Sequence, residues 1–241
     1  LTGALGGLRT YKVLRHLVLA RRPPRPADRS CVEVAAGFQH LDEGLPDRAQ
    51  AAFERAVALN SNSGWGELGI GLSLLRVGRS ADALPHLDMA TSLGVSPPAL
   101  ALARAFAARA VGRVEEARQV TAVRHHGDLE HFAQLLEAHL ARDAGDLDGA
   151  LEGFDVLGDR RLRDGDVPHG GVAPYGLDGR GWTLLAAGRE AEAAEAFSAA
   201  NELGDRLHVT PHLLGWPHLG LGVILGRAGR TDEALAELAI A

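Results

Sequence analysis

Residues 78–83 read Gly-Arg-Ser-Ala-Asp-Ala, and the same pattern, a glycine followed five residues later by an alanine, recurs along the chain. The other copies are GLPDRA at 44–49, GRVEEA at 112–117, GDLDGA at 145–150, GREAEA at 188–193 and GRTDEA at 229–234. Successive glycines are separated by 34, 34, 33, 43 and 41 residues. Six copies in one register indicate a chain built from a repeated structural unit.

The residues around each glycine repeat as well, and their sizes are typical of closely packed helices. Seven positions before each glycine stands a small residue: Gly37, Gly71, Ala105, Ala138, Gly181 and Gly222. Four positions after the alanine a bulky residue follows in five copies: Phe53, Leu87, Phe154, Phe197 and Leu238. Small residues let two helix backbones approach, and a bulky residue fills the next groove. The repeated glycine is expected to end a helix in the left-handed conformation.

This pattern resembles the tetratricopeptide repeat, a unit of two antiparallel helices, over roughly residues 30–241. The resemblance implies an all-α, right-handed superhelical solenoid of about six helix pairs. We expect the repeats at 30–63, 64–97, 98–130, 131–163, 174–207 and 215–241, with an insertion at 163–174 and a second near 204–214. Repeat three has Thr121 and Arg124 where a bulky and a small residue are expected, which predicts a loosely packed or functional second helix.

Charge is distributed unevenly along the chain, whose formal net charge is −6. Residues 1–29 hold seven basic side chains and one acidic one, so they are expected to form a basic arm on an acidic body. The acidic body would repel phosphate, which argues against a nucleic-acid partner. Three roles stay open for the basic amphipathic segment 11–22: a cap on the first repeat, a helix on an anionic membrane surface, or a partner-binding arm.

The two ends of the sequence lead us to expect further residues on either side. The chain begins at Leu1 without a methionine, and an apolar helical pattern is still running at Ala241. The compartment stays open: a cytoplasmic or membrane-associated location is favoured, and a periplasmic one remains an alternative.

Motifs that would carry chemistry are weak in this sequence. Gly64–Gly69 (GWGELG) matches a dinucleotide fingerprint, but a polar linker precedes it instead of a strand, so we interpret its glycines as helix-packing positions. The single cysteine, Cys31, excludes an intrachain disulfide. Histidines cluster at 125–139 and 208–218, where solvated polar positions are the simpler interpretation than a metal site. We expect no metal, no cofactor and no catalytic residue, and therefore not an enzyme.

The resemblance also implies where a partner binds, because first-helix positions such as the second and ninth of each repeat unit face a concave groove in the family. The candidate groove residues are Phe38, Trp65, Leu72, Phe106, Phe132, His139, Tyr175, Trp182 and Trp216. The Lys, Arg and Asn set that clamps carboxylate tails in some family members is missing, so a helical or extended apolar segment of a protein is the expected ligand. Alternatively, these large side chains simply pack between repeats.

Two functions follow as expectations. The first is a protein-interaction scaffold or assembly subunit of a larger complex, with a membrane-bound complex among the candidates. The second is an accessory repeat region of a larger enzyme, for example a sulfotransferase or glycosyltransferase, whose catalytic domain lies outside this chain.

Overall fold

The structure is a computed structural model that describes residues 25–123, 128–158, 173–206 and 215–240. The chain divides into two compact units, residues 1–120 and 121–241, and each is described by itself. The helices of the first unit are α2 (Pro26–Asp42), α3 (Pro46–Leu59), α4 (Gly64–Arg76), α5 (Ser80–Ser92), α6 (Pro98–Ala110) and α7 (Val114–Thr121). Those of the second are α8 (Asp128–Asp143), α9 (Leu147–Gly158), α10 (Ala173–Ala186), α11 (Glu190–Arg206), α12 (Gly215–Arg227) and α13 (Thr231–Leu238).

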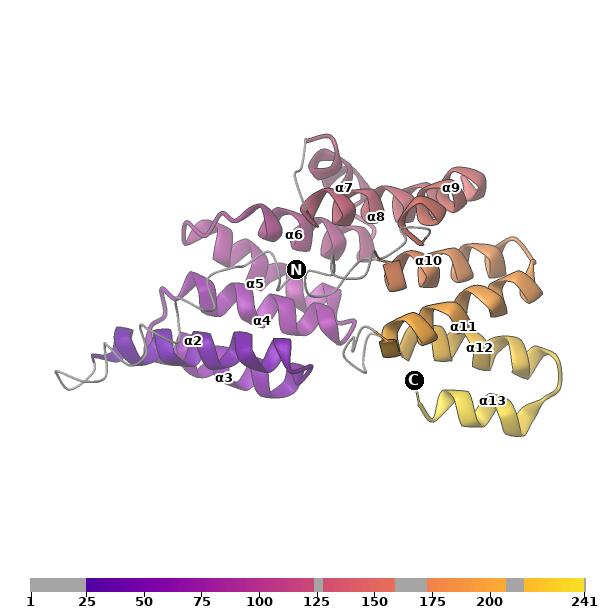
Figure 1. The fold of residues 1–241 in the computed structure, drawn as a ribbon. Coiled ribbons are helices and arrows are strands. Elements are labelled where there is room, and N and C mark those ends of the chain that lie inside the picture. Colours follow the sequence, from indigo (N-terminus) through magenta and orange to yellow (C-terminus); the bar gives the residue numbers. More distant parts are fainter. Residues whose placement is uncertain (1–24, 124–127, 159–172, 207–214, 241) are drawn as a thin grey trace. The chain divides into compact units, whose positions relative to one another are not determined.

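Across these described ranges every regular element is a helix, and the helices follow one another in six pairs, each joined by a short turn (Figure 1). Consecutive helices pack together from α2 to α6 in the first unit and from α8 to α13 in the second, and first helices of neighbouring pairs also touch: α4 contacts α2 and α6, and α10 contacts α8 and α12. The predicted all-α helical repeat fold is confirmed. The right-handed superhelix stays a prediction.

The repeated glycines end the first helices in the predicted way. All six lie in the left-handed region, with φ of 75° at Gly44, 75° at Gly78, 81° at Gly112, 84° at Gly145, 76° at Gly188 and 74° at Gly229. The residue after each glycine donates its backbone N–H to the carbonyl five positions back, for example Arg79 to Leu74 at 2.9 Å. This bond is the one that closes a Schellman motif, so the glycine fixes the turn between the two helices of a pair.

Two phenylalanines of the second helices, Phe53 and Phe197, are each buried against glycines of two first helices. A Cβ atom at Gly37, in the same repeat, would lie 2.5 Å from the Phe53 ring, and one at Gly69, in the next repeat, would lie 2.3 Å from it. Phe197 stands in the same relation to Gly181 and Gly220, at 2.5 and 2.4 Å. The ring therefore occupies the space that a side chain at either glycine would need, which links neighbouring pairs.

The motif at Gly64–Gly69 opens helix α4, as the sequence analysis interpreted it. Ser63 caps this helix by accepting a hydrogen bond from the Gly66 N–H at 3.3 Å. A Cβ at Gly64 would lie 2.5 Å from Val95, and one at Gly66 would lie 2.9 Å from Val57. All three glycines of the motif are thus packing positions.

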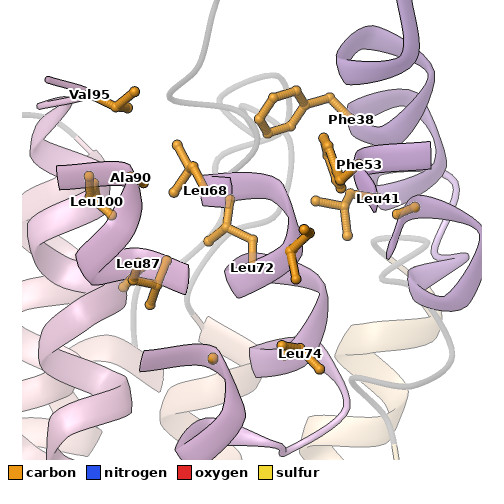
Figure 2. Close-up of a cluster of buried hydrophobic side chains, with 14 of the residues drawn as sticks. Phe38, Leu41, Phe53, Leu68, Leu72, Leu74, Leu87, Ala90, Val95 and Leu100 are labelled. Atoms are coloured by element: carbon orange, nitrogen blue, oxygen red, sulfur yellow. The ribbon is translucent and has the colours of Figure 1, made fainter. Parts of the chain in front are cut away.

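The core of the first unit lies between these helices. Figure 2 shows Phe38 next to Phe53, Leu68 and Leu72 on the middle helix, and Leu87 and Leu100 on the other side. In the second unit a cluster forms around Leu184 and Phe197, with Trp182 packed against it. No helix of the described ranges is long and apolar enough to cross a membrane.

Several boundaries differ from the expected ones. Helix α2 begins at Pro26, inside the expected arm, because proline suits the first turn and Asp28 accepts the Arg25 N–H at 2.9 Å. Ala173 and Pro174 belong to α10, whereas the rest of the expected insertion, 163–172, lies outside the described residues. The amphipathic segment 11–22 and most of the second insertion, 207–214, lie outside them as well. Helix α7 has 8 residues, of which Ala117 is buried; a loosely packed or functional second helix in repeat three stays a prediction.

Candidate functional site

In the first unit, some of the predicted groove residues are buried and others are exposed. Phe38 and Leu72 are each 8% exposed and belong to the hydrophobic core (Figure 2). Phe106 is half-buried, and Trp65 is 45% exposed. The rings of Phe38 and Trp65 meet edge to face with centroids 6.4 Å apart. Phe38 and Leu72 thus fit the packing alternative, whereas Trp65 offers a surface.

In the second unit none of the predicted groove residues is fully buried. Phe132, His139, Tyr175 and Trp182 are half-buried, and Trp216 is 54% exposed. His139 rests edge-on against Phe154 with ring centroids 5.0 Å apart. Trp182 rests in the same way against Phe197 at 5.2 Å. These contacts hold each ring against a buried phenylalanine.

Asp178 on α10 is a polar residue of this face that the sequence analysis did not single out. Its Oδ1 accepts a hydrogen bond from the Trp182 indole Nε1 at 3.0 Å, one helical turn away. Burial raises the pKa of the Asp178 carboxyl to about 7, and the hydrogen bond from Trp182 and the positive charge of Arg142 offset only part of that shift. The carboxyl is therefore half ionised near neutral pH.

A comparison of the six first helices provides a signal that reveals Asp178. Ten positions before the repeated glycine, five repeats carry an aliphatic residue: Val34, Leu68, Leu102, Leu135 and Leu219. The first four of these side chains are buried, which identifies the position as a packing one. Repeat five alone places a carboxyl there. A carboxyl in place of an aliphatic side chain at a buried position disfavours folding. Ionisable residues with strongly shifted pKa values are frequent at functional sites.

Two histidine–glutamate pairs join the helices of single repeats at equivalent positions. In repeat two, His86 Nδ1 on α5 lies 2.6 Å from Glu67 Oε2 on α4. In repeat six, His218 Nδ1 on α12 lies 2.6 Å from Glu237 Oε2 on α13. In repeat two the glutamate lies on the first helix and the histidine on the second, whereas in repeat six the histidine lies on the first helix and the glutamate on the second. Each pair is satisfied internally, so we assign it to the joining of the helices.

Sites for other chemistry are not assembled in the described part of the chain. Within it, no three His, Cys, Asp or Glu side chains gather as metal ligands. Cys31 is exposed. His125, His126, His208 and His212, which belong to the two histidine clusters of the sequence, lie outside the described residues.

Residues 215–239 match the family model described as "Tetratricopeptide repeat". Among curated proteins, cellulose synthase operon protein C of Komagataeibacter xylinus is 34% identical over 126 residues, which are 52% of this chain and 9% of that protein.

Two solved structures share the fold at low sequence identity. The Cut9–Hcn1 hetero-tetramer of the APC/C matches 99% of this chain and 44% of the solved chain, with a TM-score of 0.63 and 15% identity. Human IFIT1, solved as a dimer with m7Gppp-AAAA, matches 96% of this chain and 55% of its own, with a TM-score of 0.61 and 15% identity. The chain thus spans about half or less of the length of these proteins.

Proposed function

This chain is a tetratricopeptide-repeat protein, and we propose that it binds a helical or extended segment of a partner protein, as a scaffold or assembly subunit of a larger complex. Such repeats indicate a protein-interaction or scaffold role, and the fold is typically non-catalytic. The finer proposal places a bound segment along the first-helix face of each unit, which we define as the second and ninth repeat positions of α4 and α6 in the first unit, and as those of α8, α10 and α12 together with Asp178 in the second.

The observation that carries this proposal is the exposure of large aromatic side chains at one repeat position. Trp65 and Trp216 occupy the second position of α4 and α12 and are 45% and 54% exposed. An exposed tryptophan buries a large apolar area when a partner covers it, and tryptophan is enriched among residues that dominate binding energy. In the second unit Tyr175 lies at the same second position and Trp182 at the ninth; both are half-buried, so they add to the aromatic surface of that unit.

The test removes the exposed tryptophans and leaves the core intact. Tagged wild-type chain and the double variant Trp65→Ala, Trp216→Ala are purified from the source cells, and the co-purifying proteins are identified by mass spectrometry. A matched control removes two equally exposed apolar residues of the second helices, Met89→Ala and Val156→Ala, which are 49% and 54% exposed.

We expect the tryptophan variant to lose its co-purifying proteins while the control retains them, with helix content unchanged in both. Unchanged partners in the tryptophan variant would contradict binding at the first-helix face. Loss of partners in the control alone would move the binding surface to the second helices.

A second candidate function is supported by one comparison. The match to cellulose synthase operon protein C covers 9% of a much longer protein, which favours a repeat region that serves a larger enzyme system. The complete reading frame decides between the two: a catalytic domain in the same frame supports the accessory role, and its absence supports the separate scaffold. Contact of the basic N-terminal arm with a membrane stays a proposal, to be tested by sedimentation with anionic vesicles.

A further inference from the structure

We propose that Asp178 and the aromatic residues beside it form a binding site for a basic side chain, the guanidinium of an arginine or the ammonium of a lysine, on the segment that the first-helix face holds. This inference rests on the proposed function, since it names the chemistry of one residue of the bound segment. It concerns the second unit only.

The position of Asp178 in the repeat shows that packing does not explain it. The other five repeats carry valine or leucine there, and four of these side chains are at most 9% exposed. A carboxyl at the same position loses hydration without the gain from burying an aliphatic chain. A role in ligand binding would explain why a residue that disfavours folding occupies a packing position.

Asp178 retains capacity for a further donor. An ionised carboxylate offers about four acceptor positions, and the Trp182 indole occupies one of them at 3.0 Å. That bond, together with the edge contact between Trp182 and Phe197, fixes the indole in one orientation. The acceptor and the aromatic ring are therefore held in place before a ligand arrives, which lowers the entropy that binding costs.

The aromatic residues flank the carboxyl on the same helix. Tyr175 lies three residues before Asp178 and Trp182 four residues after it, so all three share one face of α10. The Trp182 indole touches the carboxyl, so an arginine or lysine head that reaches the carboxylate would also meet this ring, and cation–π attraction would add to the charge interaction. The arrangement of one acid between two aromatic residues favours a cation over an anionic or purely apolar group.

Among the described residues, the positive charge of Arg142 on α8 acts on Asp178 and offsets only part of the effect of burial. Its Nε lies 3.8 Å from Asp143 Oδ1 on its own helix. The pKa of Asp178 stays raised, to about 7, although the charge of Arg142 lowers it. Arg142 therefore leaves most of the cost of burying the carboxylate uncompensated, and a ligand cation would compensate it.

The experiment selects ligands without knowing the partner. A phage-displayed library of random 12-residue peptides is selected on four folded chains: wild type, Asp178→Asn, Asp178→Leu and the control Asp205→Asn. Asp205 is an exposed acid on α11 of the same unit, so its variant removes the same charge elsewhere. Circular dichroism confirms folding, and we expect Asp178→Leu to melt at or above the wild-type temperature, since leucine is the residue of the other repeats.

We expect peptides selected by wild type and Asp205→Asn to share an arginine or lysine at a fixed distance from an apolar residue, and those selected by the two Asp178 variants to lack it. The best peptide should bind Asp178→Asn at least tenfold more weakly than wild type. Its own Arg/Lys→Gln form should bind wild type and Asp178→Asn equally.

Two results would overturn the inference, and they are distinguishable from failure of the proposed function. If the same basic residue is enriched on the Asp178 variants, or if enriched peptides carry no basic residue on wild type, then Asp178 only pairs with Arg142. If no chain enriches any peptide, the peptide-binding function itself fails, and the Asp178 site fails with it.

Discussion

At the scale of single residues, the packing of neighbouring helices depends on positions where only a side chain of one size fits. Ala49 and Ala193 are fully buried at the repeated alanine position. The glycines opposite Phe53 and Phe197 leave no room for a methyl group. Protein interiors are packed as densely as crystals, so added volume at these positions has to displace a helix.

We expect Ala49→Trp to destabilise the protein by about 1–3 kcal/mol or more, because overpacking a close helix contact forces side chains and backbone apart. Ala51→Trp is the matched control, since Ala51 lies on the same helix α3 and is exposed. Denaturant midpoints followed by circular dichroism measure the difference. Equal midpoints for the two variants would show that the repeat register is wrong, and Ala193→Trp against Ala191→Trp repeats the test in the second unit.

Asp178 gives a prediction about pH at the same scale. Its folded pKa of about 7 lies above the ordinary value of 3.8, so between these values the folded chain binds the proton that the unfolded chain has released. The free energy of unfolding therefore decreases as pH rises from about 4 to about 7, by an amount on the order of a few kcal/mol. Above about pH 7 both states are ionised, and the full penalty is present.

The variant Asp178→Asn removes this titration. We expect its stability relative to wild type to increase between pH 5 and pH 8, measured by urea unfolding at each pH. The control Asp205→Asn should follow wild type. Parallel curves for wild type and Asp178→Asn would contradict a raised pKa at this carboxyl.

At the scale of the helix pair, polar contacts repeat in register as the apolar ones do. The position after the loop glycine carries arginine in four repeats, and each arginine pairs with an acid three residues on, at the start of the second helix. In repeat four the same position is Asp146, whose Oδ1 accepts the Gly149 N–H at 3.0 Å. These residues are exposed, so they define the start of the helix more than they stabilise it.

The exchanged His–Glu pairs allow a direct test of equivalence between repeats. His86→Glu places a second carboxylate against Glu67, which we expect to destabilise the chain by on the order of 1 kcal/mol. The double variant Glu67→His, His86→Glu recreates the order found in repeat six, where His218 precedes Glu237, and should recover most of that loss. Denaturant midpoints of the single and double variants give the coupling, and additive losses would show that the two repeats differ in backbone geometry.

At the scale of the whole molecule, each compact unit holds three helix pairs with a core of its own. Stability in repeat proteins is a sum of repeat terms and nearest-neighbour interfaces, and about three repeats suffice for a stable array. Neither unit therefore requires the other for its own core.

We expect a fragment of residues 121–241 to be helical and to unfold cooperatively on its own, because Phe154 packs on Gly179, and Phe197 on Gly181 and Gly220, within that fragment. Far-ultraviolet circular dichroism and a denaturant titration of this fragment, beside the fragment of residues 1–120, measure this. A spectrum without helix for either fragment would show that its folding depends on the other. A sheet-dominated spectrum of the full chain would contradict the fold itself.

The sequence by itself determined the helix pairs, because their signals are local. Contacts within one repeat and its neighbour require the positive φ of Gly78, the small size of Ala83 and the bulk of Leu87. Because the pattern occurs six times, these requirements can be recognised in the sequence. Only the tertiary structure decided which aromatic residues are surface and which are core: Phe38 and Trp65 occupy positions that the sequence treated alike, yet one is buried and the other exposed. Asp178 stands out in the aligned repeats, but only the tertiary structure showed that its pKa is raised, because the pKa of a carboxyl depends on how much water its surroundings exclude, and that is a property of packed neighbours and not of sequence spacing.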